Sequence, residues 1–112
     1  MTGMPELPSV TVAVLTFKRP ADIQAALPQL LDQVHRYSGE GRVLVIDNDA
    51  AASAAPIVDM LADPSLTYVV EPTPGIAAAR NRALAETSTD LIVFIDDDER
   101  PVADWLELLV TE

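Results

Sequence analysis

The amino-acid sequence predicts an α/β domain with an open, mostly parallel sheet of about four strands and helices on both faces. Three observations lead to this fold class. Short runs of β-branched and aliphatic residues alternate four times with helix-like segments, and only a few residues connect one segment to the next. The chain has 112 residues, enough for one modest hydrophobic core, so residues 1–112 are expected to form a single domain. Alternation of this kind is typical of parallel strands joined by right-handed crossovers.

The expected strands are apolar on both faces, as strands covered by helices on both sides require. They comprise residues 9–17, 42–47, 66–70 and 90–95. Between and after them, helices are expected at about 21–35, 56–62, 76–87 and 102–110. Pro20 and Pro56 suit first helical turns, whereas Pro28 falls inside the first helix and is expected to interrupt or kink it. The arrangement is Rossmann-like.

The composition excludes several classes of partner and site. Eighteen acidic and seven basic residues give a formal net charge of -11, which argues against a nucleic-acid surface and against binding an anionic membrane by charge. The absence of cysteine excludes disulfides and thiolate metal sites. The N-terminal residues show no basic and apolar leader, and no apolar run approaches the roughly 20 residues of a membrane span. A cytoplasmic protein is therefore expected, with its oligomeric state open.

Polar side chains gather where the expected strands end. Because ligands of open parallel sheets bind outside the carboxyl ends of the strands, these side chains are candidates for a shared site. The first strand leads into Thr16, Phe17, Lys18 and Arg19, the second into Asp47, Asn48 and Asp49, the third into Glu71 and a loop before Arg80, and the fourth into Asp96, Asp97 and Asp98.

The run Asp96-Asp97-Asp98 directly follows a buried strand, with no turn residue until Pro101. An acidic run of this kind is commonly only a solvated loop. Converging carboxylates repel one another, however, and a hard divalent cation with oxygen ligands removes that repulsion. We therefore favour a Mg²⁺ or Mn²⁺ site here over a solvated loop.

Other polar residues have a structural and a functional interpretation. Asp47 is either a turn former or an acceptor for an N–H group of a base. Arg80 lies about one turn into an alanine-rich helix near the ligand edge, which favours a binding role. Arg82 on the same helix is expected to be a surface charge.

Four segments in this order and spacing carry a resemblance: "VTVAVLTFKRP", "VLVIDNDA", "EPTPGIAAARNRALAE" and "LIVFIDDDERPVADWLELL". Together they resemble the N-terminal, nucleotide-sugar-binding half of a family 2 glycosyltransferase with the GT-A fold. The resemblance extends from about Ser9 to Val110. One departure is Leu15-Thr16-Phe17-Lys18, where the family more often shows Pro-Thr-Tyr-Asn.

The resemblance implies a metal-dependent enzyme that transfers a sugar from a UDP, GDP or dTDP donor to an acceptor. It also implies roles for individual residues. Around the base, Thr16, Phe17 and Arg19 would line the pocket, and Asp47 would accept a hydrogen bond from an N–H group of the base. Arg80 would lie against the nucleotide, and Asp96 would bind the ribose side. Asp97 would be the variable middle position, and Asp98 would ligate Mg²⁺ or Mn²⁺.

The general base and the acceptor pocket of such an enzyme lie in the family's second half, beyond Glu112. The 112 residues are therefore expected to be a truncated donor-binding portion that does not transfer sugars alone. A non-catalytic nucleotide- or metal-binding module of the same fold is the alternative. A phospho-acceptor signalling domain is disfavoured, because it needs an acidic pair after the first strand and a lysine after a late strand, whereas Lys18 is the only lysine.

Overall fold

The computed structural model describes residues 7–111 and shows the alternating order that the sequence predicts. Within these residues, all strand pairs are parallel and the order across the sheet is β3-β2-β1-β4, so the predicted α/β class is confirmed. The strands are β1 Val10–Thr16, β2 Gly41–Asp47, β3 Leu66–Val70 and β4 Leu91–Asp96. The helices are α1 Pro20–Arg36, α2 Ala55–Leu61, α3 Ile76–Glu86 and α4 Trp105–Thr111.

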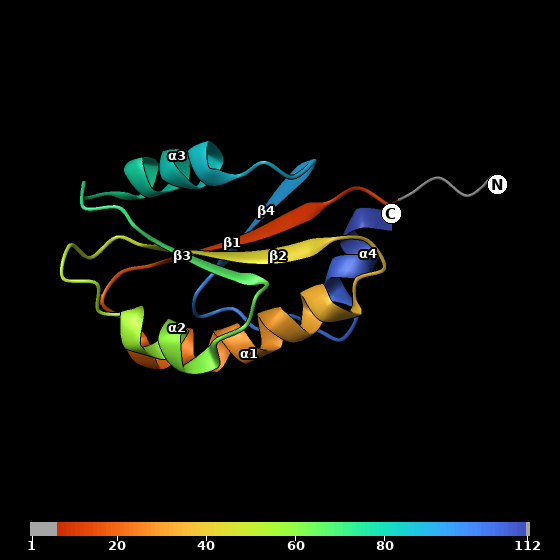
Figure 1. Ribbon diagram of the computed structural model, residues 1–112, viewed down its shortest axis with the longest axis horizontal. Coiled ribbons are helices and arrows are strands. Elements are labelled where there is room, and N and C mark those ends of the chain that lie inside the picture. The colour runs from red at the N-terminus through yellow and green to blue at the C-terminus, as the bar shows by residue number, and fades with distance from the viewer. Residues whose placement is uncertain (1–6, 112) are drawn as a thin grey trace.

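Helices cover both faces of the sheet, with α3 on one side and α1, α2 and α4 on the other (Figure 1). Successive side chains of a strand point to opposite faces, so each central strand contributes to two clusters. Val12 and Val14 pack with Leu27 of α1, while Ala13 packs with Ala79 of α3. Burial on both faces explains why the strand sequences are almost continuously apolar.

The crossovers place a topological switch point between β1 and β4. From β1 the chain moves outward through β2 to β3, and then returns through α3 to put β4 on the other side of β1. The register pairs Thr16 with Asp47, Leu15 with Asp96, and Asp47 with Val70. The carboxyl ends of the strands therefore lie at one edge, where the loops after β2 and β3 appear at the left of Figure 1.

Most element boundaries lie within one residue of the prediction, but two expectations are wrong. Helix α1 runs continuously through Pro28, so the expected interruption is wrong, while the kink stays a prediction. Pro28 is exposed, and so is Gln24, the residue whose carbonyl loses its helical donor to the proline.

Helix α4 begins at Trp105, three residues later than predicted. The reason is local: Asp104 has a φ of 61°, which lies outside the right-handed helical region. Gln33 of α1 fixes this start, because its side-chain nitrogen donates to the Val102 carbonyl (3.0 Å) and its oxygen accepts from the Leu106 N–H (3.0 Å).

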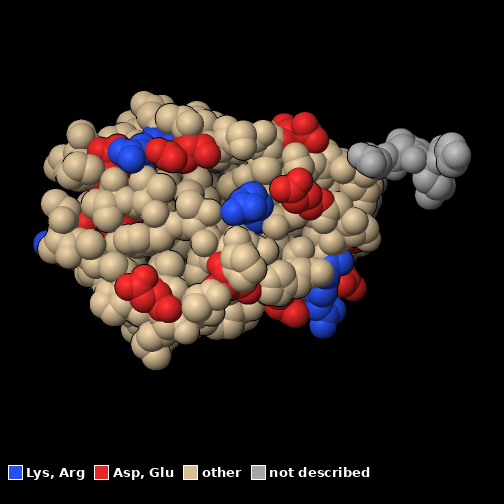
Figure 2. All heavy atoms as spheres, viewed as in Figure 1, with Lys and Arg blue, Asp and Glu red and all other residues tan. Residues whose placement is uncertain are grey.

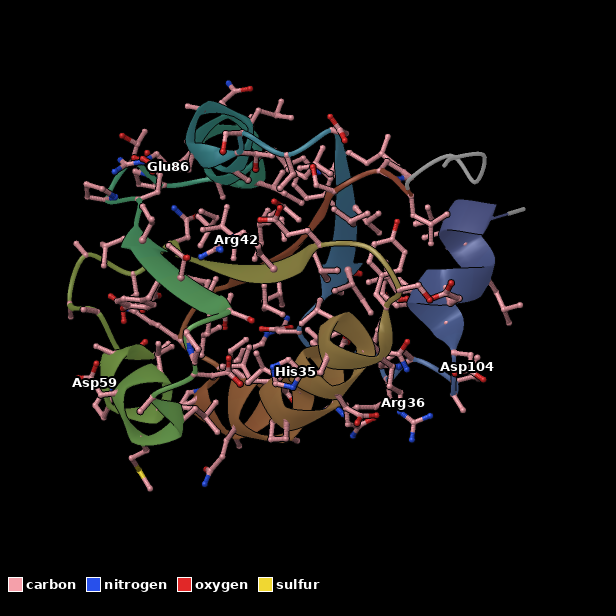
Figure 3. The ribbon with its side chains drawn as sticks, turned by 45° about the vertical axis from the view of Figure 1, so that its right-hand side comes forward. His35, Arg36, Arg42, Asp59, Glu86 and Asp104 are labelled. Atoms are coloured by element: carbon pink, nitrogen blue, oxygen red, sulfur yellow. The ribbon has the colours of Figure 1, made fainter. Side chains whose placement is uncertain are left out.

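Acidic side chains are spread over the face shown in Figure 2, and most basic atoms in that view lie beside acidic ones. Arg36 pairs with Asp32 on α1 (3.0 Å) and reaches Asp104 before α4 (3.7 Å), as Figure 3 shows for the latter pair. The Nε2 atom of His35 lies 3.1 Å from a carboxylate oxygen of Asp63. Among residues 7–111, no helix is long and apolar enough to cross a membrane, and the expected cytoplasmic location stays a prediction.

Candidate functional site

A cavity of about 620 Å³ lies at the carboxyl edge of the sheet, at the switch point between β1 and β4. Its volume is in the range of small-molecule sites. Every residue to which the resemblance assigns a role lines it except Asp47. Of the other polar residues at the strand ends, Asn48 lines it, whereas Lys18, Asp49 and Glu71 do not. The full lining is Leu15, Thr16, Phe17, Arg19, Asn48, Pro74, Gly75, Ile76, Ala79, Arg80, Phe94, Ile95, Asp96, Asp97 and Asp98.

Asp47 is fully buried and does not line the cavity. Its carboxylate accepts hydrogen bonds from the Asp49 N–H (3.1 Å), the Ala54 N–H (3.0 Å) and the Tyr68 hydroxyl (2.6 Å). Burial, and then the Asp47 carboxylate itself, raise the pKa of the Tyr68 hydroxyl, which keeps it a donor. Asp47 therefore ties the loop after β2 to β3, and its contact with a base stays a prediction.

Asn48 lines the cavity and organises its wall, a role that the sequence analysis missed. Its side-chain nitrogen donates to the carbonyls of Glu71 (2.8 Å) and Thr73 (2.8 Å), and its side-chain oxygen accepts from the Gly75 N–H (3.1 Å). One side chain at the end of β2 thus holds the loop between β3 and α3. The sequence signal for this role is the position of Asn48 directly after a buried strand, between Asp47 and Asp49.

Further contacts within the same loop complete its conformation. Glu71 accepts from the Thr73 N–H (2.9 Å), and this bond, with Arg82 as a further contribution, lowers the pKa of the Glu71 carboxyl. Arg82 bridges Glu71 (3.4 Å) and Glu86 (3.0 Å), so the expected surface charge is a paired one. Gly75 has a φ of 112°, a conformation that only glycine adopts readily, immediately before α3.

The aspartate run divides into one buried and two exposed side chains. Asp97 is only 4% exposed, and it accepts from the Thr16 hydroxyl (3.0 Å) and pairs with Arg19 (3.3 Å). Burial raises the pKa of the Asp97 carboxyl, while the bonds from Thr16 and Arg19 oppose that rise. Asp96 and Asp98 are exposed at the cavity. The middle position is thus the most constrained of the three, which the sequence did not indicate.

The exposed pair of aspartates offers a small set of cation ligands. Among the residues that the structure describes, no group of three or more His, Cys, Asp or Glu side chains is arranged to hold a metal ion. Mg²⁺ and Mn²⁺ sites commonly use one or two carboxylates, with phosphate oxygens and water as the other ligands. The residues present therefore fit a cation that shares its ligands with a bound phosphate, rather than a cation held by the protein alone.

Arg80 supplies positive charge to the same cavity. Its guanidinium carbon lies 5.5 Å from the centre of the Phe94 ring. Within residues 7–111 no carboxylate is within ion-pairing distance of Arg80, whereas Arg19, which lines the same cavity, pairs with Asp97. The cavity thus combines an unneutralised guanidinium with two exposed carboxylates.

Comparison with known proteins assigns the chain to a family. Residues 11–112 match the model of glycosyl transferase family 2. The chain belongs to this family. This family 2 chain is 34% identical over 104 residues to the succinoglycan biosynthesis protein ExoM of Rhizobium meliloti (strain 1021), which covers 90% of the chain and 33% of that protein. It is 29% identical over 91 residues to the uncharacterized glycosyltransferase YwdF of Bacillus subtilis (strain 168), and this match covers 80% of the chain and 32% of YwdF.

Solved structures show the same fold. The mannosyltransferase PcManGT from Pyrobaculum calidifontis, in complex with GDP-Man and Mn²⁺, superposes with a TM-score of 0.71 at 27% identity, over 90% of this chain and 31% of that one. TarS 1-349 of S. aureus superposes with a TM-score of 0.69 at 20% identity, over 92% of this chain and 31% of TarS 1-349. The family 2 chain therefore spans about a third of the length of the relatives it matches.

Proposed function

We propose that the cavity binds the nucleoside diphosphate part of a nucleotide-sugar, and that the protein serves in metal-dependent transfer of that sugar to an acceptor. The observation that carries the proposal is the meeting of Arg80, Asp96 and Asp98 in one cavity at the switch point. A diphosphate attracts a guanidinium, and a diphosphate-bound divalent cation attracts carboxylates. Membership of family 2 supports the same reaction class.

Each lining residue has a part in this proposal. Phe17, 54% exposed at the end of β1, offers an aromatic face to the base, with Thr16 and Arg19 beside it. Asp96 accepts from a ribose hydroxyl, and Arg80 donates to the diphosphate. Asp98 contributes a carboxylate to Mg²⁺ or Mn²⁺, a cation that, when bound, neutralises charge on the departing nucleoside diphosphate.

Asp97 supports this site from the interior of the protein. Its bonds to Thr16 and Arg19 connect the end of β4 to the end of β1. Because its carboxylate is already engaged and buried, we propose no direct contact between Asp97 and the cation.

We further propose that these residues form one donor-binding unit, and that the general base and the acceptor site come from sequence outside it. The chain alone is then expected to bind donors without sustained transfer. A non-catalytic module would share the same cavity, so only transfer by a protein of the relatives' full length distinguishes the two.

Calorimetric titration of UDP, GDP and dTDP, each with MnCl₂, tests the proposal. We expect one of them to bind, and Arg80→Gln to weaken it about tenfold or more, because a charged hydrogen bond is lost. Arg42→Gln is the matched control, because it removes the same charge near the start of β2 from a residue that does not line the cavity. Absence of binding, or equal loss in both variants, contradicts the proposal.

A further inference from the structure

Phe94 is a large aromatic residue that is not buried in the hydrophobic core. It lies on β4, which pairs with β1 alone among the described strands and so forms an edge of the sheet. Strand alternation puts it on the same face as Ile92, which packs against the hydrophobic cluster that includes Ala79 and Ala83 of α3. Its side chain is nevertheless 36% exposed and lines the cavity. The ring is therefore available to a neighbour or a ligand.

That neighbour is Arg80. It lies one helical turn after Ile76, on the part of α3 that faces the cavity. Its guanidinium carbon is 5.5 Å from the Phe94 ring centre, inside the roughly 6 Å within which cation–π attraction is appreciable.

An aromatic partner and a carboxylate partner have different consequences for an arginine. A carboxylate would orient the side chain but would cancel its charge and occupy its N–H groups, as Glu71 and Glu86 do for Arg82. A ring face orients the planar guanidinium while leaving its charge and its in-plane donors free. Arg80 has such a ring partner and, among the described residues, no carboxylate partner, so its charge stays available to the cavity.

We propose that Phe94 is a positioning residue that holds the Arg80 guanidinium at the cavity wall for a diphosphate. This inference rests on the proposed function. The ring restricts the arginine before the ligand arrives, so less conformational freedom is lost on binding. Phe94 itself does not contact the diphosphate; it acts through Arg80.

A double-mutant cycle tests the coupling between Phe94 and Arg80. The measured quantity is the affinity, in the presence of MnCl₂, for whichever of UDP, GDP and dTDP binds most tightly. Phe94→Leu keeps apolar bulk but removes the ring, and we expect it to weaken binding about three- to tenfold. Phe94→Tyr keeps a ring and should stay within about twofold of the unmodified chain. In an Arg80→Gln background, Phe94→Leu should change affinity by less than about twofold, because no guanidinium remains to be positioned.

A second readout needs no ligand. In the unmodified chain the Arg80 Nε–H proton should show a ring-current shift that Phe94→Leu removes and Phe94→Tyr preserves. Equal losses from Phe94→Leu in both backgrounds, or an Arg80 resonance that does not respond to Phe94→Leu, would overturn the inference while leaving the proposed function intact. A chain with the ring-current shift that binds none of the three nucleotides would instead overturn the proposed function and the diphosphate role with it.

Discussion

Replacement of the buried Asp47 carboxylate should destabilise the protein even when no ligand is present. Asp47→Ala removes the acceptor for the Asp49 and Ala54 N–H groups and for the Tyr68 hydroxyl. A residue whose only role was to contact a base would instead change ligand affinity and leave the unfolding free energy unchanged. The ligand-free measurement therefore separates the structural role from the predicted one.

The magnitude follows from the three donors. Each buried donor left unsatisfied costs about 1–3 kcal/mol, while removing a buried carboxylate relieves part of its desolvation penalty. We expect Asp47→Ala to lower the unfolding free energy by about 3 kcal/mol or more, a large share of the roughly 5–15 kcal/mol of a typical domain. Tyr68→Phe, which removes one bond only, should cost about 1 kcal/mol.

Equilibrium unfolding in urea, followed by circular dichroism, measures both effects. Tyr68→Phe should cost much less in the Asp47→Ala background, because the hydroxyl has already lost its acceptor. The structural interpretation of Asp47 is refuted if Asp47→Ala lies within about 0.5 kcal/mol of the unmodified chain and shows no coupling to Tyr68.

Three further predictions concern the loop between β3 and α3. Asn48→Asp loses two donors and sets a carboxylate against the carbonyls of Glu71 and Thr73, so amide hydrogen exchange in residues 71–75 should accelerate; unchanged exchange would contradict this. Gly75→Ala should lower the unfolding free energy in urea by about 1–3 kcal/mol through its φ of 112° alone, since a Cβ there meets no atom within 4 Å. The lowered pKa of Glu71 contributes stability that is present above its ordinary value of 4.5 and is lost as the pH falls through the native pKa. Melting temperatures measured against pH should therefore fall less steeply in acid for Glu71→Gln, and an unchanged slope would argue against this contribution.

The fold was predictable because strands buried on both faces leave a clear pattern. A run such as residues 10–16, almost wholly apolar, has few alternatives once helical segments alternate with it. Parallel topology then places every strand's carboxyl end at one edge, so Thr16, Arg80 and Asp98 could be grouped from the sequence alone.

The direction of individual side chains at that edge was not predictable. Successive residues point to opposite faces, but which face carries the cavity depends on where α3 packs, and the sequence alone does not determine that. For this reason Asn48 rather than Asp47 lines the cavity, and Asp97 rather than its neighbours is buried.

The most direct test is a thermal-shift series with Mn²⁺ and the nucleoside diphosphate that binds, each variant compared with its own ligand-free midpoint. A ligand that binds only the folded state adds RT ln(1 + [L]/Kd) of stability, and phosphate oxygens complete the coordination of the cation. Mn²⁺ and nucleotide together should therefore raise the melting temperature by more than the sum of their separate effects. Asp98→Asn should lose most of this excess, and Asp97→Asn should keep it, because the Asp97 side chain is buried against Thr16 and Arg19. The metal assignment is contradicted if the unmodified chain shows no excess, or if Asp97→Asn and Asp98→Asn behave alike.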